Sequence, residues 1–365
     1  MRQVIRSIAW TCLLKIASAA SAADVAWLAD VQQAPDKPSS FDVGKMEPLL
    51  KLADGTSVTN VESWKRRRQE LETAWQSFLG PNLSTPNNTN ITVLKTETLE
   101  AVTRSLIRYE CEPNLFVEAY LLRPPIVDGV RRPGLVALHH TAQATIDEIA
   151  GVSGPESRKI GLKLAQRGFV VICPRCFLWQ DAATLMSAVE TFRSRHPQSL
   201  GMRKMLFDGQ RALDILAAQS DVDPKRIGAV GHSLGAKEAM YLAAFDQRVK
   251  AAVASEGGTA LASTNWDAPW YLGPQIKDPS FSRNHHELLA LIAPRAFLIL
   301  GGEAGPGAAD GERSWPLIEA ALPVHKLYIK PPRLGLLNHR EGHSIPDSAF
   351  ERTSEWLKIY LNNAD

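Results

Sequence analysis

One short motif constrains this chain more than any other feature. Gly231-His232-Ser233-Leu234-Gly235 lies directly between a short apolar run at 227–230 and a helical pattern that starts at 236. A serine on a tight strand-to-helix turn is lifted off the strand end into an open cleft, and flanking glycines permit that turn. A serine hydroxyl is a poor nucleophile until a base can reach it. The motif therefore predicts a nucleophile elbow in which Ser233 attacks.

The segments around the elbow alternate between helix and strand patterns. Apolar residues recur at helical spacing over 201–219, a turn follows at 221–224, and the elbow's strand comes next. Further strands are predicted at 135–139, 169–173, 249–255, 296–300 and 326–330, and helices at 157–166, 287–292 and 349–361. Such alternation is typical of a mostly parallel sheet covered by helices on both faces.

The first 22 residues have the three zones of a secretory signal. Two arginines precede an apolar run at 8–14, and small residues follow at Ala20-Ser21-Ala22. A helical N-terminus kept on a cytosolic protein is the alternative. Removing residues 1–22 takes away three cations and lowers the formal net charge from +2 to −1, so no basic balance argues for nucleic acid or an anionic membrane. No other apolar run is long enough to span a bilayer.

The remaining chain divides into an extension and a catalytic region. Residues 23–114 are expected to pack on the core as an N-terminal extension, with an amphipathic helix at 64–79 and strands at 90–99 and 102–109. Residues 115–365, which start with a strand at 115–122, are expected to form the catalytic domain. A chain of 365 residues is long enough to bury a large core in this arrangement.

A base and an acid are expected later in the chain, on loops that follow late strands. Of five downstream histidines, His343 lies on a loop before the closing helix, and Gly342 allows its backbone to approach the nucleophile. His339, on the same loop, is the alternative. The other three are expected at the surface or as helix caps: His285, His286 and His325. Three carboxylates sit on suitable loops: Glu256 after the strand at 249–255, and Glu303 and Asp310 after the strand at 296–300.

Backbone donors for the developing oxyanion are expected from two places. The N–H of Leu234 lies at a helix start, where unpaired donors and the helix dipole favour negative charge. A second donor is expected from the loop after residues 135–139, at His140 or Thr141. His140 as a metal ligand is the rival interpretation, but no acidic or histidine partner lies at ligand spacing. Neither a metal nor an organic cofactor is expected.

Cys173 and Cys176 have the spacing of a redox dithiol, C-x-x-C. A redox pair is expected at a helix N-terminus, whereas an apolar loop follows here. A structural role is therefore expected for both, and the spacing does not decide whether they pair. A zinc site would need a second ligand pair, which the sequence does not offer.

Several motifs resemble those of the secreted α/β-hydrolases grouped with dienelactone hydrolases and acetyl xylan esterases. The similar segments are 138–141, 223–228 leading into the elbow, 255–258, 265–270 and the helix at 64–80. The resemblance implies an α/β-hydrolase fold with Ser233 as nucleophile and His343 as base. It also implies Asp310 as the acid, because residues 309–315 resemble the acid-bearing segment, with 305–307 as an insertion; Glu303 and Glu256 are the alternatives. Dienelactone hydrolases proper use a cysteine nucleophile, so Ser233 points to ordinary esters.

Glucuronoyl esterases are a second, weaker match. Lys237 has the spacing of their sugar-binding lysine, but Leu234 stands where they carry an arginine, which speaks against uronate recognition. Trp266, Trp270 and Tyr271 could form an aromatic platform for a sugar ring, or pack a lid against the core.

The expected function is that of a serine ester hydrolase acting outside the cytoplasm, with acyl groups of carbohydrates as the expected substrates. A glucuronoyl-esterase-like hydrolase is an alternative, and a hydrolase-fold protein that binds without catalysis is another. Peptidase or thioesterase activity would use the same acyl-transfer groups. The acyl group, the alcohol and the oligomeric state do not follow from the sequence.

Overall fold

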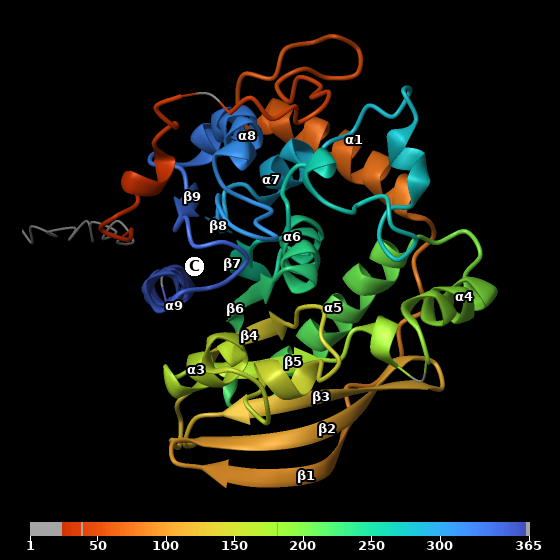
Figure 1. The fold of residues 1–365 in the computed structure, drawn as a ribbon, viewed down its shortest axis with the longest axis vertical. Coiled ribbons are helices and arrows are strands. Elements are labelled where there is room, and N and C mark those ends of the chain that lie inside the picture. The colour runs from red at the N-terminus through yellow and green to blue at the C-terminus, as the bar shows by residue number, and fades with distance from the viewer. Residues whose placement is uncertain (1–23, 38, 181, 363–365) are drawn as a thin grey trace, which may run out of the picture.

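The computed structural model describes residues 24–37, 39–180 and 182–362. A nine-stranded sheet runs through it in the order β1-β2-β3-β5-β4-β6-β7-β8-β9 (Figure 1). The strands are β1 (Ile91–Leu99), β2 (Val102–Glu112), β3 (Leu115–Arg123), β4 (Arg132–Leu138), β5 (Val170–Pro174), β6 (Val222–His232), β7 (Val249–Ser255), β8 (Ala296–Gly301) and β9 (Leu334–Asn338).

The sheet has a parallel part and an antiparallel part. Strands β5, β4, β6, β7, β8 and β9 pair in parallel, while β1, β2 and β3 pair antiparallel and join the sheet through β5. The predicted mostly parallel sheet is therefore confirmed, with an antiparallel edge added. The expected division at residue 114 falls between β2 and β3, which pair with each other from Thr103 opposite Arg123 to Glu112 opposite Leu115.

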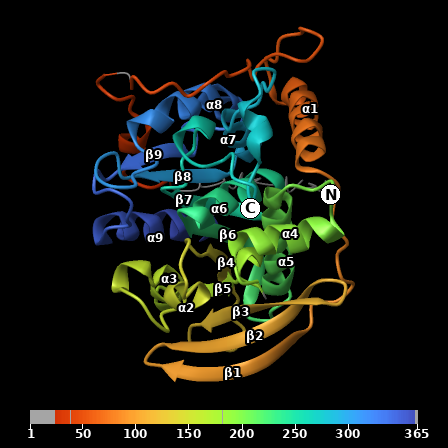
Figure 2. The ribbon, with the colours of Figure 1, turned by 45° about the vertical axis from the view of Figure 1, so that its right-hand side comes forward.

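Helices cover both faces of the sheet. The helices are α1 (Val61–Leu79), α2 (Ile146–Ile149), α3 (Ile160–Gln166), α4 (Leu185–Arg195), α5 (Gly201–Ala217), α6 (Leu234–Phe245), α7 (His286–Ile292), α8 (Trp315–Tyr328) and α9 (Asp347–Asn362). Helices α2, α3 and α9 bury one face, and α1 and α4 to α8 bury the other (Figure 2). Strand residues alternate between the two cores: in β8, Phe297 and Ile299 join one core and Leu298 and Leu300 the other.

Helix α1 confirms the amphipathic helix predicted at 64–79. Asn60 caps its start by accepting from the backbone N–H of Ser63 at 2.9 Å, and the Ser63 hydroxyl completes a capping box. Its apolar stripe is buried, and the indole N–H of Trp75 donates to Glu287 of α7 at 2.6 Å. The helix ends at Gly80, which has a φ of 99°.

Residues before α1 pass over α8 at the top of Figure 1, and the first of the described residues pack against α9. Trp27 packs on Trp356 of α9 with ring centroids 5.7 Å apart, and its N–H donates to Glu355 at 2.7 Å. Further along, the carbonyl of Val43 accepts from the amide of Asn284 at 2.7 Å. The predicted signal segment, residues 1–22, lies outside the described residues. Among the helices of the described ranges, none is long and apolar enough to cross a membrane.

The predicted strand at 326–330 is wrong. Helix α8 continues to Tyr328, and the last strand of the sheet is β9 at Leu334–Asn338. The run Lys-Leu-Tyr-Ile-Lys alternates like a strand, but its first half completes an apolar helical stripe that begins at Leu317. Short apolar runs do not separate helix from strand by periodicity alone.

Three histidines expected at the surface are buried. His285, His286 and His325 expose no more than 1% of their surface, and each ring bonds to a backbone carbonyl. Burial lowers the pKa of His285 to about 3 and that of His325 to about 4. The expected surface position is wrong for all three, because each ring finds an internal acceptor that compensates for lost water. His285 does stand at the N-cap position of α7, but its side chain makes no capping bond.

The elbow is packed so closely that two glycines are required. A Cβ at Gly231 would lie 2.0 Å from the carbonyl oxygen of Gly235, and a Cβ at Gly235 would lie 2.1 Å from that of Leu138, the last residue of β4. The strand end of β4 therefore rests directly on the turn that carries Ser233.

Gly235→Ala should lower the free energy of unfolding by about 2 kcal/mol or more, because the added methyl group meets backbone that cannot rotate away. Gly209→Ala in α5 is the matched control, since its Cβ would meet only the methyl groups of Leu242 at 3.3 Å. Urea unfolding of both variants measures the difference. Equal losses in the two would contradict the close approach of β4.

His325→Gln should flatten the pH dependence of stability in the acid range. The unfolded chain binds a proton on His325 below about pH 6.5, whereas the folded chain does so only near its lowered pKa of about 4. This group therefore destabilises the fold as the pH falls from about 6.5 to 4, by about 1 kcal/mol per pH unit. Gln can still donate to the carbonyl of Leu289. The free energy of unfolding of both proteins is measured between pH 6.5 and 4.5. An equal change with pH in variant and parent would argue against a neutral buried His325.

Candidate active site

Ser233 sits on the turn between β6 and α6. Its backbone is strained, with a φ of 57° and a ψ of −117°, and its N–H donates to the carbonyl of Ser255 at 2.8 Å. Leu234 is the first residue of α6, a position whose N–H has no partner inside the helix. The predicted order of strand, elbow and helix is therefore confirmed. Ser233 directly precedes α6, so the N-terminus of that helix lies next to its side chain.

The loop after β4 lies against this turn. In addition to Leu138, the carbonyl oxygen of His139 would lie 2.9 Å from a Cβ at Gly235. The structure thus brings the backbone of 138–139 to the elbow, next to the two residues expected to donate to an oxyanion. Of these, His140 is 6% exposed, and Thr141 is exposed.

His139, which the sequence did not single out, fixes this loop. Its Nε2 accepts from the backbone N–H of Cys176 at 3.0 Å, so Nδ1 carries the proton and donates to the carbonyl of His140 at 2.8 Å. Burial lowers the pKa of His139 to about 4, which keeps the ring neutral. The ring therefore joins the end of β5 to the loop expected to hold the oxyanion.

The side chain of His140 faces a carboxylate. Its Nε2 lies 3.0 Å from Oε2 of Glu148, and the guanidinium of Arg158 contacts both groups. Burial, followed by the charge of Arg158, lowers the pKa of His140. Glu148 lies eight residues along the chain in α2, so sequence spacing gave no indication of this pair.

His343 and Glu256 face each other. His343 lies on the loop between β9 and α9, as predicted, with its side chain 31% exposed, and its Nδ1 is 3.6 Å from Oε2 of Glu256. Glu256 directly follows β7, has a φ of 57°, and its side chain is fully buried. It accepts from the backbone N–H of Ala309 at 2.5 Å and from that of Gly302. These two bonds orient the carboxylate toward the imidazole.

Asp310, the predicted acid, is directed elsewhere. Its carboxylate accepts from the N–H groups of Gly258 and Thr259 at 2.8 and 2.6 Å and from the Ser314 hydroxyl at 2.6 Å. In the part of the chain that the structure describes, His343 pairs within 4.0 Å with Glu256 and not with Asp310. The expected pairing is corrected by this geometry: Asp310 braces the loop after β7 instead.

Glu303 and His339 are also held by local bonds. Glu303 accepts from the Asn338 amide at 3.1 Å and from the backbone N–H of Glu312. The Nδ1 of His339 accepts from the N–H of Glu341 at 3.1 Å, and burial lowers the pKa of this histidine. Both residues stabilise loops around the site, and the structure pairs neither with His343 or Glu256.

A second buried ring lies beneath His343. The centroid of His232 is 4.7 Å from that of His343, and its Nδ1 is 3.1 Å from the Ser255 hydroxyl. Burial, with the charge of His343, holds the pKa of His232 well below its usual value. The residue was visible in the elbow motif, but the motif alone did not indicate that its ring packs against His343.

Lys237 and Trp266 form part of the core. The Lys237 ammonium lies 3.8 Å from the Trp266 ring centroid and 4.9 Å from that of Tyr271, and it donates to the Thr264 hydroxyl. Burial lowers the pKa of Lys237 to about 7. Trp266 exposes none of its surface and Tyr271 only 3%, so the aromatic platform is wrong for these two, and they pack a lid against the core. Trp270 is partly buried against the same core.

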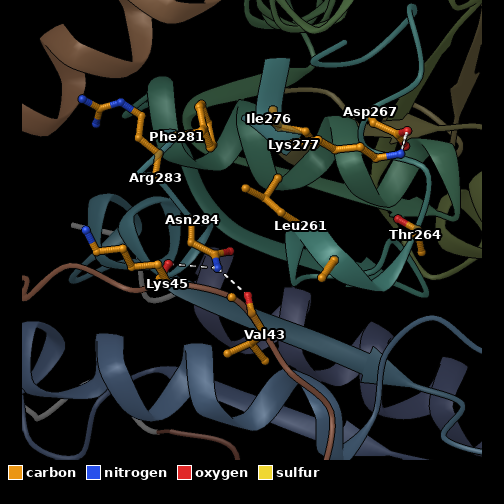
Figure 3. A pocket seen from close by; sticks show the side chains of 12 residues that line it. Val43, Lys45, Leu261, Thr264, Asp267, Ile276, Lys277, Phe281, Arg283 and Asn284 are labelled. Atoms are coloured by element: carbon orange, nitrogen blue, oxygen red, sulfur yellow. Dashed lines mark hydrogen bonds and ion pairs between the residues drawn. The ribbon is translucent and has the colours of Figure 1, made fainter. Parts of the chain in front are cut away.

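The segment between β7 and α7, residues 256–285, contains Trp266 and Tyr271, and we call it the lid. A hollow of about 460 Å³ is lined by this segment and by residues 43–45 (Figure 3). Figure 3 shows Leu261, Ile276 and Phe281 from the lid on one side and Val43 on the other. Thr264, the partner of Lys237, lines the same hollow. Lys237 therefore does not line the hollow itself but bonds to the hydroxyl of a residue that does.

The cysteines at 173 and 176 are free and buried, as is Cys111. Burial raises the pKa of the Cys173 and Cys176 thiols, which disfavours the reactive thiolate. This agrees with the structural role that was expected for them.

Comparison with known proteins connects this geometry to a family. Residues 118–291 match the sequence profile of the dienelactone hydrolase family. YtaP of Bacillus subtilis strain 168 is 36% identical over 104 residues, which span 27% of this chain and 34% of YtaP. The chain thus matches about a third of the length of that curated relative.

Solved structures share the fold over most of their length. A glucuronoyl esterase from Solibacter usitatus superposes with a TM-score of 0.69 at 18% identity, covering 89% of this chain and 99% of that one. A family 15 glucuronoyl esterase from Teredinibacter turnerae T7901 gives 0.64 at 19% identity, covering 86% and 88%. The elbow, the mixed sheet with helices on both faces and the similar solved structures lead to one conclusion: the chain has the α/β-hydrolase fold, and its residues 118–291 are similar to the dienelactone hydrolase family.

Proposed function

We propose that this protein is a serine carboxylic ester hydrolase whose triad is Ser233, His343 and Glu256. The observation that carries the proposal is the buried Glu256 carboxylate 3.6 Å from Nδ1 of His343. The loops that carry this pair follow β7 and β9, which lie parallel to the elbow strand β6 in one sheet. Carboxyl ends of parallel strands meet at one edge, so these loops and the elbow share that edge.

Each residue has a defined part in the reaction. The Glu256 carboxylate faces Nδ1 of His343 and stabilises a proton there, which leaves Nε2 free to take the proton of the Ser233 hydroxyl as that oxygen attacks the ester carbonyl. The imidazolium so formed returns the proton to the leaving alcohol. Water then attacks the acyl-enzyme by the same route, with His343 again as base.

The oxyanion is stabilised by backbone N–H groups. Leu234 supplies one from the start of α6, and the loop at His140 and Thr141 supplies the second from across the carbonyl. The bonds of His139 to Cys176 and to His140 keep this loop in place before substrate arrives. Preorganised donors of this kind are worth about 3–4 kcal/mol each in acyl transfer.

Esters of carbohydrates are the proposed substrates. The similar structures named above are glucuronoyl esterases. Lys237 has the spacing from Ser233 that the resemblance to those enzymes gives their sugar-binding lysine. Because that lysine is buried here, acetylated sugars and methyl esters of glucuronate both belong in the first substrate panel. The zones at residues 1–22 support action outside the cytoplasm.

Glu256→Gln should lower kcat by roughly 10³–10⁴ with KM little changed, because Gln preserves the shape but not the charge that stabilises the imidazolium. Asp310→Asn should keep kcat within about tenfold, because its carboxylate bonds to backbone and Ser314 rather than to His343. Hydrolysis of p-nitrophenyl acetate by both variants measures the contrast.

Ser233→Ala is the reference for complete loss, and thermal unfolding shows that each variant is folded. A large loss of kcat in Asp310→Asn together with normal turnover in Glu256→Gln would return the acid to Asp310. If the parent protein shows no serine-dependent turnover of any ester in the panel, the fold serves binding rather than catalysis.

A further inference from the structure

Two adjoining hollows lie outside the candidate active site. Their volumes are about 320 and 310 Å³, and both are lined by Arg108, Phe116 and Gln180. The first is completed by Glu118, Arg175 and Trp179. We refer to the six residues Arg108, Phe116, Glu118, Arg175, Trp179 and Gln180 as the β3 groove.

The β3 groove opens at the same sheet edge as the active site. Strand β3 begins where β5 ends, because the two are antiparallel, and the N–H of Arg175 donates to the carbonyl of Glu118 at 3.0 Å. In the sheet order, β3 is three strands from β6, a separation of about 14 Å at the usual strand spacing. An occupant of the groove would therefore lie beside the catalytic residues but not on them.

A chain of contacts connects the groove with the candidate oxyanion loop. The Trp179 ring packs edge-on against the His139 ring, with centroids 5.3 Å apart. Trp179 ends a short helical turn, Phe177–Trp179, that begins directly after Cys176, the residue whose N–H bonds to His139. The wall of the groove and the loop next to Ser233 are thus parts of one packed unit.

Two aromatic side chains present surface in the groove. Phe116 is 49% exposed, which is unusual for a large apolar ring on a strand, and Trp179 is partly exposed. Half-exposed rings on rigid strands and turns suit stacking against the apolar faces of sugar rings.

Two of the cations around these hollows are held by carboxylates. Arg175 bonds to Glu118 at 3.1 Å and to the Thr145 hydroxyl at 2.8 Å. Lys204, which lines the second hollow, lies 2.8 Å from Glu112 and 2.6 Å from Asp208.

Arg108 differs from these cations. It is exposed, and its guanidinium lies 4.8 Å from the Phe116 ring centroid. Glu118 stands opposite it on β3 but is bonded to Arg175, and among the described residues Arg108 makes no ion pair within 4.0 Å. Its five N–H donors can hold a carboxylate from outside the protein.

We propose that the β3 groove is a subsite for a carboxylate-bearing sugar of the polysaccharide whose ester the enzyme attacks. Arg108 binds the carboxylate, while Phe116 and Trp179 stack on sugar rings. The bound unit is not the one that carries the ester, because the groove lies about three strand spacings from Ser233. This inference rests on the proposed function, and it adds a preference for acidic chains.

The test measures binding without turnover. Ser233→Ala protein is titrated calorimetrically with xylo-oligosaccharides that carry glucuronate and with neutral ones of the same length. We expect tighter binding of the acidic chain, and we expect Arg108→Ala to weaken it by about tenfold while leaving the neutral chain unchanged. Phe116→Ala should weaken both chains severalfold, because stacking does not depend on charge.

Arg131→Ala is the matched control, since Arg131 is exposed and precedes β4 at the opposite sheet edge. It should bind both chains like the parent. In a background that retains Ser233, Arg108→Ala should hydrolyse p-nitrophenyl acetate normally, because that ester is too small to reach the groove.

Equal affinity for acidic and neutral chains, or equal effects of the Arg108 and Arg131 variants, would overturn the subsite. Weaker p-nitrophenyl acetate hydrolysis by Arg108→Ala would also count against it, since the groove would then act on the active site itself. Absence of serine-dependent hydrolysis in the parent is a separate result, which removes the proposed function and leaves the titration to decide on the groove.

Discussion

The contact between the end of β4 and the elbow governs the arrangement of the whole site. The Leu138 carbonyl rests on Gly235 so closely that no side chain fits between them. Because β4 is held there, the loop that follows it must run past Ser233. His139 then bonds this loop to the end of β5, and Trp179 packs on that ring. Ser233, the loop proposed to hold the oxyanion and the wall of the β3 groove therefore depend on one approach of backbone to backbone.

A second constraint acts on the acid side of the site. The loops after β7 and β8 each bind a carboxylate of the other. Glu256 accepts from the backbone N–H groups of residues 302 and 309, while Asp310 accepts from those of residues 258 and 259. Each loop is thus held by a side chain of the other. The exchange explains why an acid that follows β7, one strand earlier than expected, faces His343, and why an acid after β8 does not.

Much of the fold followed from the sequence, because local patterns decide it. The elbow, the strands on both sides of it and helix α1 were predicted, and His343 lies on the predicted loop. What failed depended on long-range contacts. The burial of His285 and His325 requires acceptors that other segments provide, and the choice between Glu256 and Asp310 depends on how two loops cross. Trp266 looked suited to a sugar because its burial under the lid leaves no sign in its neighbours along the chain.

The packing of His232 against His343 has an electrostatic consequence. Two imidazole rings with centroids 4.7 Å apart cannot both carry charge cheaply, and His232 is buried and bonded to a hydroxyl. Its neighbour His140 is also biased toward the neutral form. The cleft therefore contains three imidazoles, and burial disfavours the charged form of two of them, His140 and His232. Transfer of a proton from His343 to either neighbouring ring is therefore disfavoured.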